Sequence, residues 1–251
     1  WELYDIRNDF SQGNDLSATH PEKLEELQAL FDSEARRNNI YPLKEPGQTF
    51  GPKFAVPDSL GGRTKMTYTA AHVRMPERSV VNVKNCSFRI TADITVPDRG
   101  CEGVIVAQGG NMAGWSLYVN SDSRPVYHYN WFGHEHFVAT SPQPLTPGRH
   151  SVVIDHAYDG GFGAGGDSVM SIDGVHVAHV RVEKSVPVIF SISGETFDVG
   201  LDSGAAVGDY PHIYRFTGAI HGVTIERLSE PSPEVRALIE DAEFRASLAV
   251  Q

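Results

Sequence analysis

The stretch Phe88-Arg89-Ile90-Thr91-Ala92-Asp93-Ile94-Thr95-Val96 decides the fold class of this chain. Apolar side chains occupy every second position of the stretch, and mostly polar side chains lie between them. Because successive side chains of a β-strand point to opposite faces, this alternation predicts a strand with one buried side and one solvent-facing side. Pro97-Asp98-Arg99-Gly100 follows directly and supplies the residues of a turn.

Strand-like runs separated by turn residues continue beyond this stretch. Phe132-Gly133 is interpreted as a two-residue hairpin turn, and Asp173-Gly174 is typical of a type I′ turn. Since no helical periodicity separates the runs, we expect an all-β fold, an antiparallel two-sheet jelly-roll sandwich of the concanavalin A-like kind. The further strands expected are residues 104–107, 115–119, 126–131, 134–138, 150–158, 168–172, 175–182, 188–193, 197–199 and 213–225.

The beginning of the chain differs from the rest. Residues 1–6 are rich in aromatic and branched side chains and predict a strand, which favours a chain that continues upstream of Trp1. Thr19-His20-Pro21-Glu22 is typical of a helix start, with Thr19 as the cap. Apolar residues follow at helical spacing, namely Leu24, Leu27, Leu30, Phe31 and Ala35. One strand and one helix cannot form a core, so we expect their packing partner to lie elsewhere.

These patterns divide the chain into four parts. Residues 1–44 form the strand and helix, residues 45–57 a linker rich in proline and glycine, and residues 58–230 the sandwich. Residues 231–251 are expected to form a C-terminal helix. Its predicted buried stripe consists of Val235, Leu238, Ile239, Ala242 and Phe244.

Charge and cysteine content limit the functions to consider. The net charge of −11 argues against a nucleic-acid partner or an anionic membrane surface, because either needs a basic patch. No apolar run approaches the roughly 18–20 residues of a membrane span. Cys86 and Cys101 flank a strand and a turn, which places them on the order of 30 Å apart. We therefore expect two free thiols, and the sequence assigns no cellular compartment.

Two segments carry a resemblance to a known family. Residues 1–43, with Trp1-Glu2-Leu3-Tyr4-Asp5 and Pro21-Glu22-Lys23-Leu24, resemble the extreme C-terminus of bacterial arylsulfatases. Residues 50–228 are similar to the concanavalin A-like sandwich of lectins, glucanases and laminin-G domains that follows this region in some long sulfatases. That second similarity rests on residues 110–118 and 197–204, and residues 243–248 match the same group.

The resemblance implies a sulfatase catalytic domain upstream, with its formylglycine nucleophile and bound calcium outside this chain. That family forms formylglycine in a Cys-x-Pro/Ala-x-Arg motif, and neither cysteine here fits the motif: Cys86-Ser87-Phe88-Arg89 has Arg one position too early, and Cys101 has no Arg. We therefore expect no catalytic centre and no cofactor of the parent enzyme in this chain. The implied role is a non-catalytic accessory portion of an arylsulfatase, which supports the catalytic domain, homo-oligomer assembly or binding of a glycan or sulfated ligand. The alternative is a free-standing carbohydrate-binding module.

The expected hairpin at residues 126–138 carries a candidate glycan face. Sugars stack their apolar ring faces on aromatic side chains, and their hydroxyl groups meet polar neighbours. With a two-residue turn, alternation places five such side chains on one face: Tyr127, Tyr129, Trp131, His134 and His136. The alternative is that the aromatic rings form the inner face of the sandwich.

A loop near the end of the sandwich carries a candidate calcium site. Asp198, Asp202 and Asp209 lie close in sequence among glycines, and Ca²⁺ prefers several oxygen ligands on a flexible loop. The alternative is a loop in which aspartates organise tight turns.

Overall fold

The computed structural model describes residues 1–38, 40–41 and 60–249, and the chain divides into two compact units, Trp1–Thr49 and Phe50–Gln251. The predicted linker, residues 45–57, lies outside the described residues. The four-part division of the chain therefore stays a prediction.

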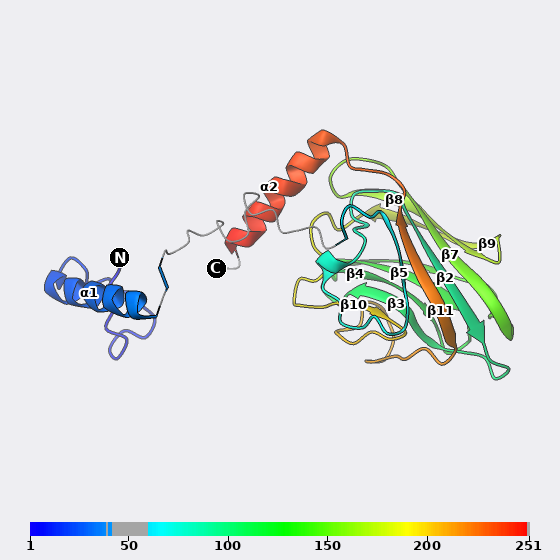
Figure 1. Cartoon of the computed structure of the whole chain (residues 1–251), viewed down its shortest axis with the longest axis horizontal. Helices are drawn as coiled ribbons and strands as arrows, with labels where there is room; N and C mark the ends of the chain where they lie inside the picture. The colour runs from blue at the N-terminus through cyan, green and yellow to red at the C-terminus, as the bar shows by residue number, and fades with distance from the viewer. Residues whose placement is uncertain (39, 42–59, 250–251) are drawn as a thin grey trace. The chain divides into compact units, whose positions relative to one another are not determined.

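The larger unit is the expected all-β sandwich of two antiparallel sheets (Figure 1). One sheet is six-stranded with the order β1-β11-β2-β7-β8-β9, and the other is five-stranded with the order β10-β3-β4-β5-β6. The six strands are β1 Lys65–Tyr68, β11 Ala219–Arg227, β2 Phe88–Val96, β7 Gly148–Tyr158, β8 Ala164–Ile172 and β9 Val175–Lys184. The five are β10 Phe197–Val199, β3 Gly103–Gly109, β4 Gly114–Val119, β5 Pro125–Trp131 and β6 Glu135–Thr140.

The six-stranded sheet is buried on one side only. Along β2, buried residues alternate with exposed or half-buried ones, as the sequence predicts. The apolar side chains of β2 and β7 join the main core against the five-stranded sheet. The polar side chains form cross-strand ion pairs on the outer face, such as Arg89 with Asp155. Alternation therefore divides this sheet into a core side and a solvent side.

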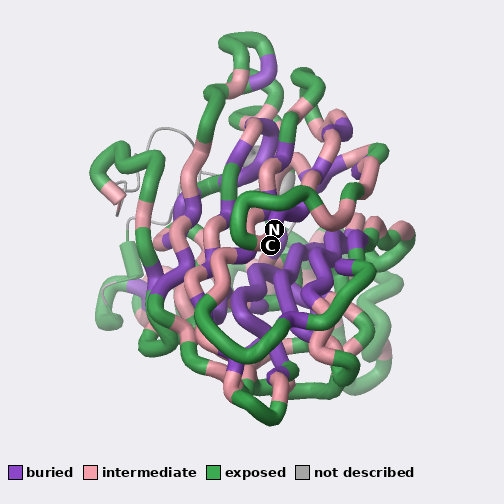
Figure 2. Tube along the Cα trace, turned by 90° about the vertical axis from the view of Figure 1, so that its right-hand side faces the viewer, coloured by how far each residue is buried: buried purple, intermediate pink, exposed green. Residues whose placement is uncertain are grey.

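The inner strands of the five-stranded sheet are buried on both sides, whereas the edge strand β6 is not. Every residue of β3 and β4 is buried, and Figure 2 shows such continuous purple stretches beside strands that alternate in colour. Residues 200–218, here called the cover segment, pack on the outer face. The Tyr118 and Tyr210 rings are 4.7 Å apart, and Val207 joins a second apolar cluster on this face. The cover segment thus replaces solvent on one side of the sheet.

Two of the predicted strands differ from the structure. Residues 188–193 form no strand; instead the backbone N–H groups of Phe190 and Ser191 donate to Glu77 in the 3₁₀ turn Glu77–Ser79. Phe190 of this run is buried, whereas Ile189 and Ile192 are 43% and 41% exposed, so apolar side chains here do not mark a strand. The last strand begins at Ala219 rather than at residue 213, because residues 213–218 belong to the cover segment. β1 was missed because four residues carry little periodicity.

The smaller unit contains helix α1, Pro21–Arg37, and no strand among its described residues. The predicted strand at residues 1–6 is wrong, since the described part of this unit offers no neighbouring strand to share its hydrogen bonds; Leu3 instead bonds to Asp15 and Leu16. The predicted cap is also wrong, because the hydroxyl of Thr19 donates to the carbonyl of Leu16 and His20 occupies the cap position. Pro21 is the first helical residue, as expected.

The apolar stripes predicted for the two helices are buried only in part. Within α1 only Ala35 is buried, and Leu30 is 56% exposed. In helix α2, Pro233–Ala249, Val235 is buried and Leu238 is 51% exposed; the side chain of Phe244 lies outside the described part. None of the described helices is long and apolar enough to cross a membrane.

Candidate functional site

The β5–β6 hairpin has a three-residue connection instead of the expected two. Trp131 pairs with Glu135, so residues 132–134 lie between the strands. One additional residue shifts the pairing by one position. Because side chains alternate with a period of two, the shift moves His136 to the face opposite the one predicted.

The two tyrosines of the candidate glycan face lie in the core. Tyr127 is 0% and Tyr129 is 3% exposed, and the hydroxyl of Tyr129 accepts a hydrogen bond from the Val186 N–H at 2.8 Å. The two rings therefore lie on the inner face of the sandwich, which was the alternative to a glycan face. A ligand in solvent therefore does not reach either tyrosine.

Trp131 lies at the rim of the sandwich and is half-buried against the core. The Lys184 ammonium of β9 lies 4.3 Å from the centroid of the indole ring and 2.5 Å from the Glu135 carboxylate. The rings of Phe132 and His134 lie 5.2 and 6.4 Å from the indole. Trp131 and His134 are therefore the two members of the predicted face that remain together near solvent.

His136 pairs instead with His128 on the outer face of the five-stranded sheet. The Nε2 atom of His128 lies 2.8 Å from the Nδ1 atom of His136. Burial, together with the neighbouring His136, lowers the pKa of His128 to about 4. The Nδ1 atom of His128 has no hydrogen-bond partner within the described residues. His128 is therefore neutral at pH 7.

The three candidate calcium ligands do not converge. The Asp198 carboxylate accepts hydrogen bonds from the backbone of Arg74 and Ser203 and from two hydroxyl groups. The Asp202 carboxylate accepts from two backbone N–H groups and, at 2.7 Å, from the hydroxyl of Tyr210. Asp209 is exposed, and no group of three potential metal ligands occurs in the described residues. The N–H and hydroxyl groups that donate to Asp198 and Asp202 indicate carboxylates that organise tight turns rather than carboxylates that coordinate calcium.

Four loops meet at the end of the sandwich that holds Trp131, and we call them the loop rim: residues 109–113, 131–134, 189–196 and 203–208. Asn130, which is fully buried, joins three of them. Its side-chain amide donates to the carbonyls of Gly110, Asn111 and Val207, and its oxygen accepts from the Gly133 N–H. The loop rim is therefore braced by one side chain.

The fourth loop joins the rim through glycines. The Gly109 N–H donates to the Thr196 carbonyl at 3.1 Å. A Cβ atom at Gly110 would meet Cγ of Glu195 at 2.5 Å and the Ala205 carbonyl oxygen at 2.8 Å. Only a glycine leaves room for this approach. The sequence contains Gly109 and Gly110, but it does not show that residues 195–196 and 205 lie against them.

Exposed apolar side chains accompany the polar groups of the loop rim. Met112 is 43% exposed at the β3–β4 turn, and Ile192 is 41% exposed. Sequence analysis singled out neither of these residues, nor Asn130 and Glu195. A rim of loops that are hydrogen-bonded to one another, with apolar and polar groups side by side, can bind a ligand that presents both kinds of surface.

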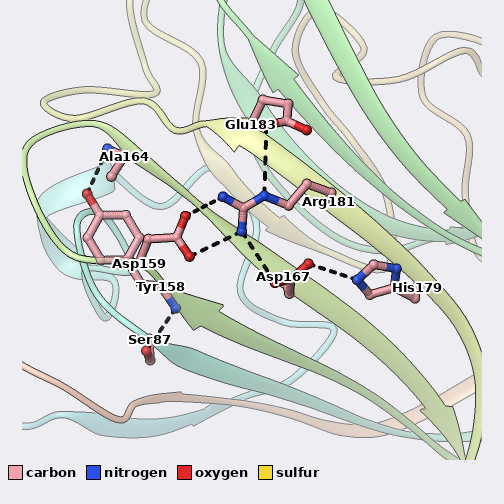
Figure 3. Close-up of polar contacts among 8 residues, drawn as sticks. All are labelled: Ser87, Tyr158, Asp159, Ala164, Asp167, His179, Arg181 and Glu183. Carbon is pink, nitrogen blue, oxygen red and sulfur yellow. Dashed lines mark hydrogen bonds and ion pairs between the residues drawn. The ribbon is translucent and has the colours of Figure 1, made fainter.

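A second polar cluster lies on the six-stranded sheet (Figure 3). Arg181 of β9 forms ion pairs with Asp159, Asp167 and Glu183, and His179 contacts Asp167 at 2.9 Å. Each charge in this network already has a partner of opposite sign. The cluster therefore stabilises a solvated face and offers no free group for chemistry.

No family model matches this chain, and no curated protein matches it. Solved structures with a similar arrangement include the CBM40 domain of the Ruminococcus gnavus IT-sialidase, bound to α2,3 sialyllactose. The identity is 12%, the match covers 69% of this chain and 91% of that one, and the TM-score is 0.46. Mouse laminin α1 domains LG4-5 show 15% identity over 59% of this chain and 39% of that one, with a TM-score of 0.40. The leech intramolecular trans-sialidase shows 12% identity over 70% and 27%, with a TM-score of 0.45.

These similarities concern lectin-type sandwiches and the fold alone. None of the three comparisons returned a sulfatase among the proteins named, so the resemblance of residues 1–43 to sulfatases has no support from them.

Proposed function

We propose that the sandwich is a non-catalytic, carbohydrate-binding module of the lectin-like kind. The observation that carries this proposal is the loop rim, in which Asn130 holds three loops together while Met112 and Ile192 stay exposed. A sugar presents C–H faces and hydroxyl groups at once, and a preformed rim binds it without a large ordering cost.

The state of the cysteines supports a non-catalytic role. Both thiols are buried and unpaired, and burial raises the pKa of Cys86 to about 12 and that of Cys101 to about 11. Because the thiolate is the reactive form, neither side chain is a nucleophile at neutral pH.

Binding to a glycan array tests the proposal. We expect the wild-type chain to bind a subset of glycans, and Trp131→Ala to weaken that binding at least tenfold. The half-buried ring also packs on the core, so this change is expected to cost about 2 kcal/mol of stability. Phe10→Ala is the control, because Phe10 is a 92% exposed aromatic residue of the other unit. No binding to any glycan would contradict the proposal.

In its more specific form, the proposal is that this chain lies C-terminal to a sulfatase catalytic domain in a longer polypeptide. Exposed apolar side chains in the first unit support a packing partner for it, since Trp1 is 75% and Leu30 is 56% exposed. The coding sequence upstream of Trp1 tests this point. We expect a Cys-x-Pro/Ala-x-Arg motif there, and its absence would leave the free-standing carbohydrate-binding module. The chain alone should release no product from an aryl sulfate above background.

A further inference from the structure

Glu195 differs from the other buried carboxylates of the sandwich in how few donors surround it. Asp198 accepts four hydrogen bonds and Asp202 accepts three. Glu77 pairs with Lys84 and accepts two backbone N–H groups. Glu195 is 9% exposed, yet its one hydrogen bond in the described part of the chain comes from the Ser193 N–H, at 2.8 Å to Oε2.

The two oxygens of the Glu195 carboxylate have different surroundings. Removing a charged group from water is unfavourable unless protein donors replace the lost hydration. Asp198 and Asp202 have those replacements, whereas the second oxygen of Glu195, Oε1, has no protein donor among the described residues and is reached by solvent. Since a binding site often contains polar groups that the fold leaves unsatisfied, this oxygen is a candidate acceptor for a ligand.

The rim is shaped around this side chain. A Cβ atom at Gly110 would meet Cγ of Glu195 at 2.5 Å and Cδ at 3.1 Å, and one at Gly204 would meet Cγ at 3.5 Å. Gly110 therefore admits the carboxylate, while Gly204 offers ordinary contact on another side. The side chain is held between two loops by packing and does not extend freely into solvent.

We propose that Glu195 is the hydroxyl-recognising carboxylate of the loop rim and selects neutral, hydroxyl-rich sugars over sulfated ones. This inference rests on the proposed function. Adjacent sugar hydroxyls donate to a carboxylate, and hydrogen bonds to a charged acceptor are roughly twice as strong as neutral ones. A sulfate group would meet the Glu195 charge in a chain whose net charge is −11. Met112 and Ile192 supply apolar surface in the adjoining loops.

Stability in the absence of sugar gives the first test. Glu195→Gln keeps the acceptor for the Ser193 N–H and removes a charge that solvent hydrates at Oε1, so we expect Tm at pH 7 to change by less than about 2 °C. Asp202→Asn is the matched variant, and its Tm should fall because three donors lose a charged partner. A fall in Tm for Glu195→Gln as large as that for Asp202→Asn would assign Glu195 a structural role and overturn the inference.

Sugar titration gives the second test, with cellobiose, lactose and mannobiose as neutral probes and a sulfated lactose as the charged one. We expect the wild type to bind a neutral disaccharide more tightly than sulfated lactose. Glu195→Gln should weaken the binding of the neutral disaccharide about tenfold or more, and it should reduce the ratio of the two affinities. Glu183→Gln is the control, since that carboxylate is 63% exposed on β9.

The outcomes separate this inference from the proposed function. Sugar binding that is lost in Trp131→Ala and unchanged in Glu195→Gln would overturn the role of Glu195 and leave the function standing. Absence of binding to all probes and to the glycan array would overturn both. A rise in Tm with CaCl₂ that Glu195→Gln abolishes would show a cation ligand and overturn hydroxyl recognition.

Discussion

The two sheets of the sandwich differ in what covers their outer faces. The six-stranded sheet meets solvent through charged pairs such as Arg89 with Asp155. The five-stranded sheet carries Tyr118 and His128 on its outer face, at 6% and 5% exposure, beneath the cover segment. The same backbone arrangement therefore serves as a solvated surface in one sheet and as a second core in the other. Polar groups beneath the cover segment, such as Nδ1 of His128, need protein partners that solvent supplies on the other sheet.

The largest expected difference comes from deleting a side chain beneath the cover segment. Tyr118→Ala should cost about 3 kcal/mol or more, because it removes the contact with Tyr210 and leaves a cavity. Thr91→Ala, on the open face of β2, should change stability by less than about 1 kcal/mol. Urea midpoints at unchanged slope measure both. Equal costs for the two variants would mean that the cover segment adds nothing to the fold.

The next-largest effect is expected in the pH dependence of the free energy of unfolding, because two histidines are buried in the folded chain. Burial lowers the pKa of His128 and of His156 to about 4 in the folded chain. Between pH 6.5 and pH 4 the unfolded chain therefore binds more protons, so stability is complete above about pH 6.5 and falls as the pH falls towards 4. Each histidine contributes a loss on the order of 3 kcal/mol.

Substitution separates the two histidines in the same measurement. His128→Gln should remove about half of this histidine-linked loss, and His156→Gln should remove the other half. The titratable groups that act on His128 are His136 and Asp209, so the profile is read against an Asp209→Asn variant. A profile for His128→Gln equal to that of the wild type would contradict the assignment.

The smallest effect is expected on the open face itself. A double-mutant cycle of Arg89→Ala and Asp155→Ala should give a coupling of about 0.5 kcal/mol or less, because both side chains are more than a third exposed. The coupling should weaken further in 1 M salt. A coupling well above 1 kcal/mol that resists salt would indicate that this face is also shielded from solvent.

The candidate site was less accessible to sequence analysis than the fold. Trp131 and His134 were predicted together and lie together at the rim. His136 was assigned to the wrong face, because the hairpin connection has three residues and the strand pairing moves by one. The sequence did not indicate a role for Glu195, because the number of hydrogen-bond donors around its carboxylate depends on the tertiary structure.

The sequence by itself determined strands β2, β7, β8 and β9 of the six-stranded sheet and the Asp173-Gly174 turn. Each residue of β2 faces either core or water, and both turn residues have positive φ, 51° and 82°, which the Asp-Gly pair tolerates. Only the tertiary structure decided the cover segment, the face of His136 and the setting of Glu195. These features depend on contacts between segments far apart in the chain, such as Val207 with Asn130 and Gly110 with Glu195. Local periodicity carries no information about such contacts, because it records burial and not the identity of the neighbour.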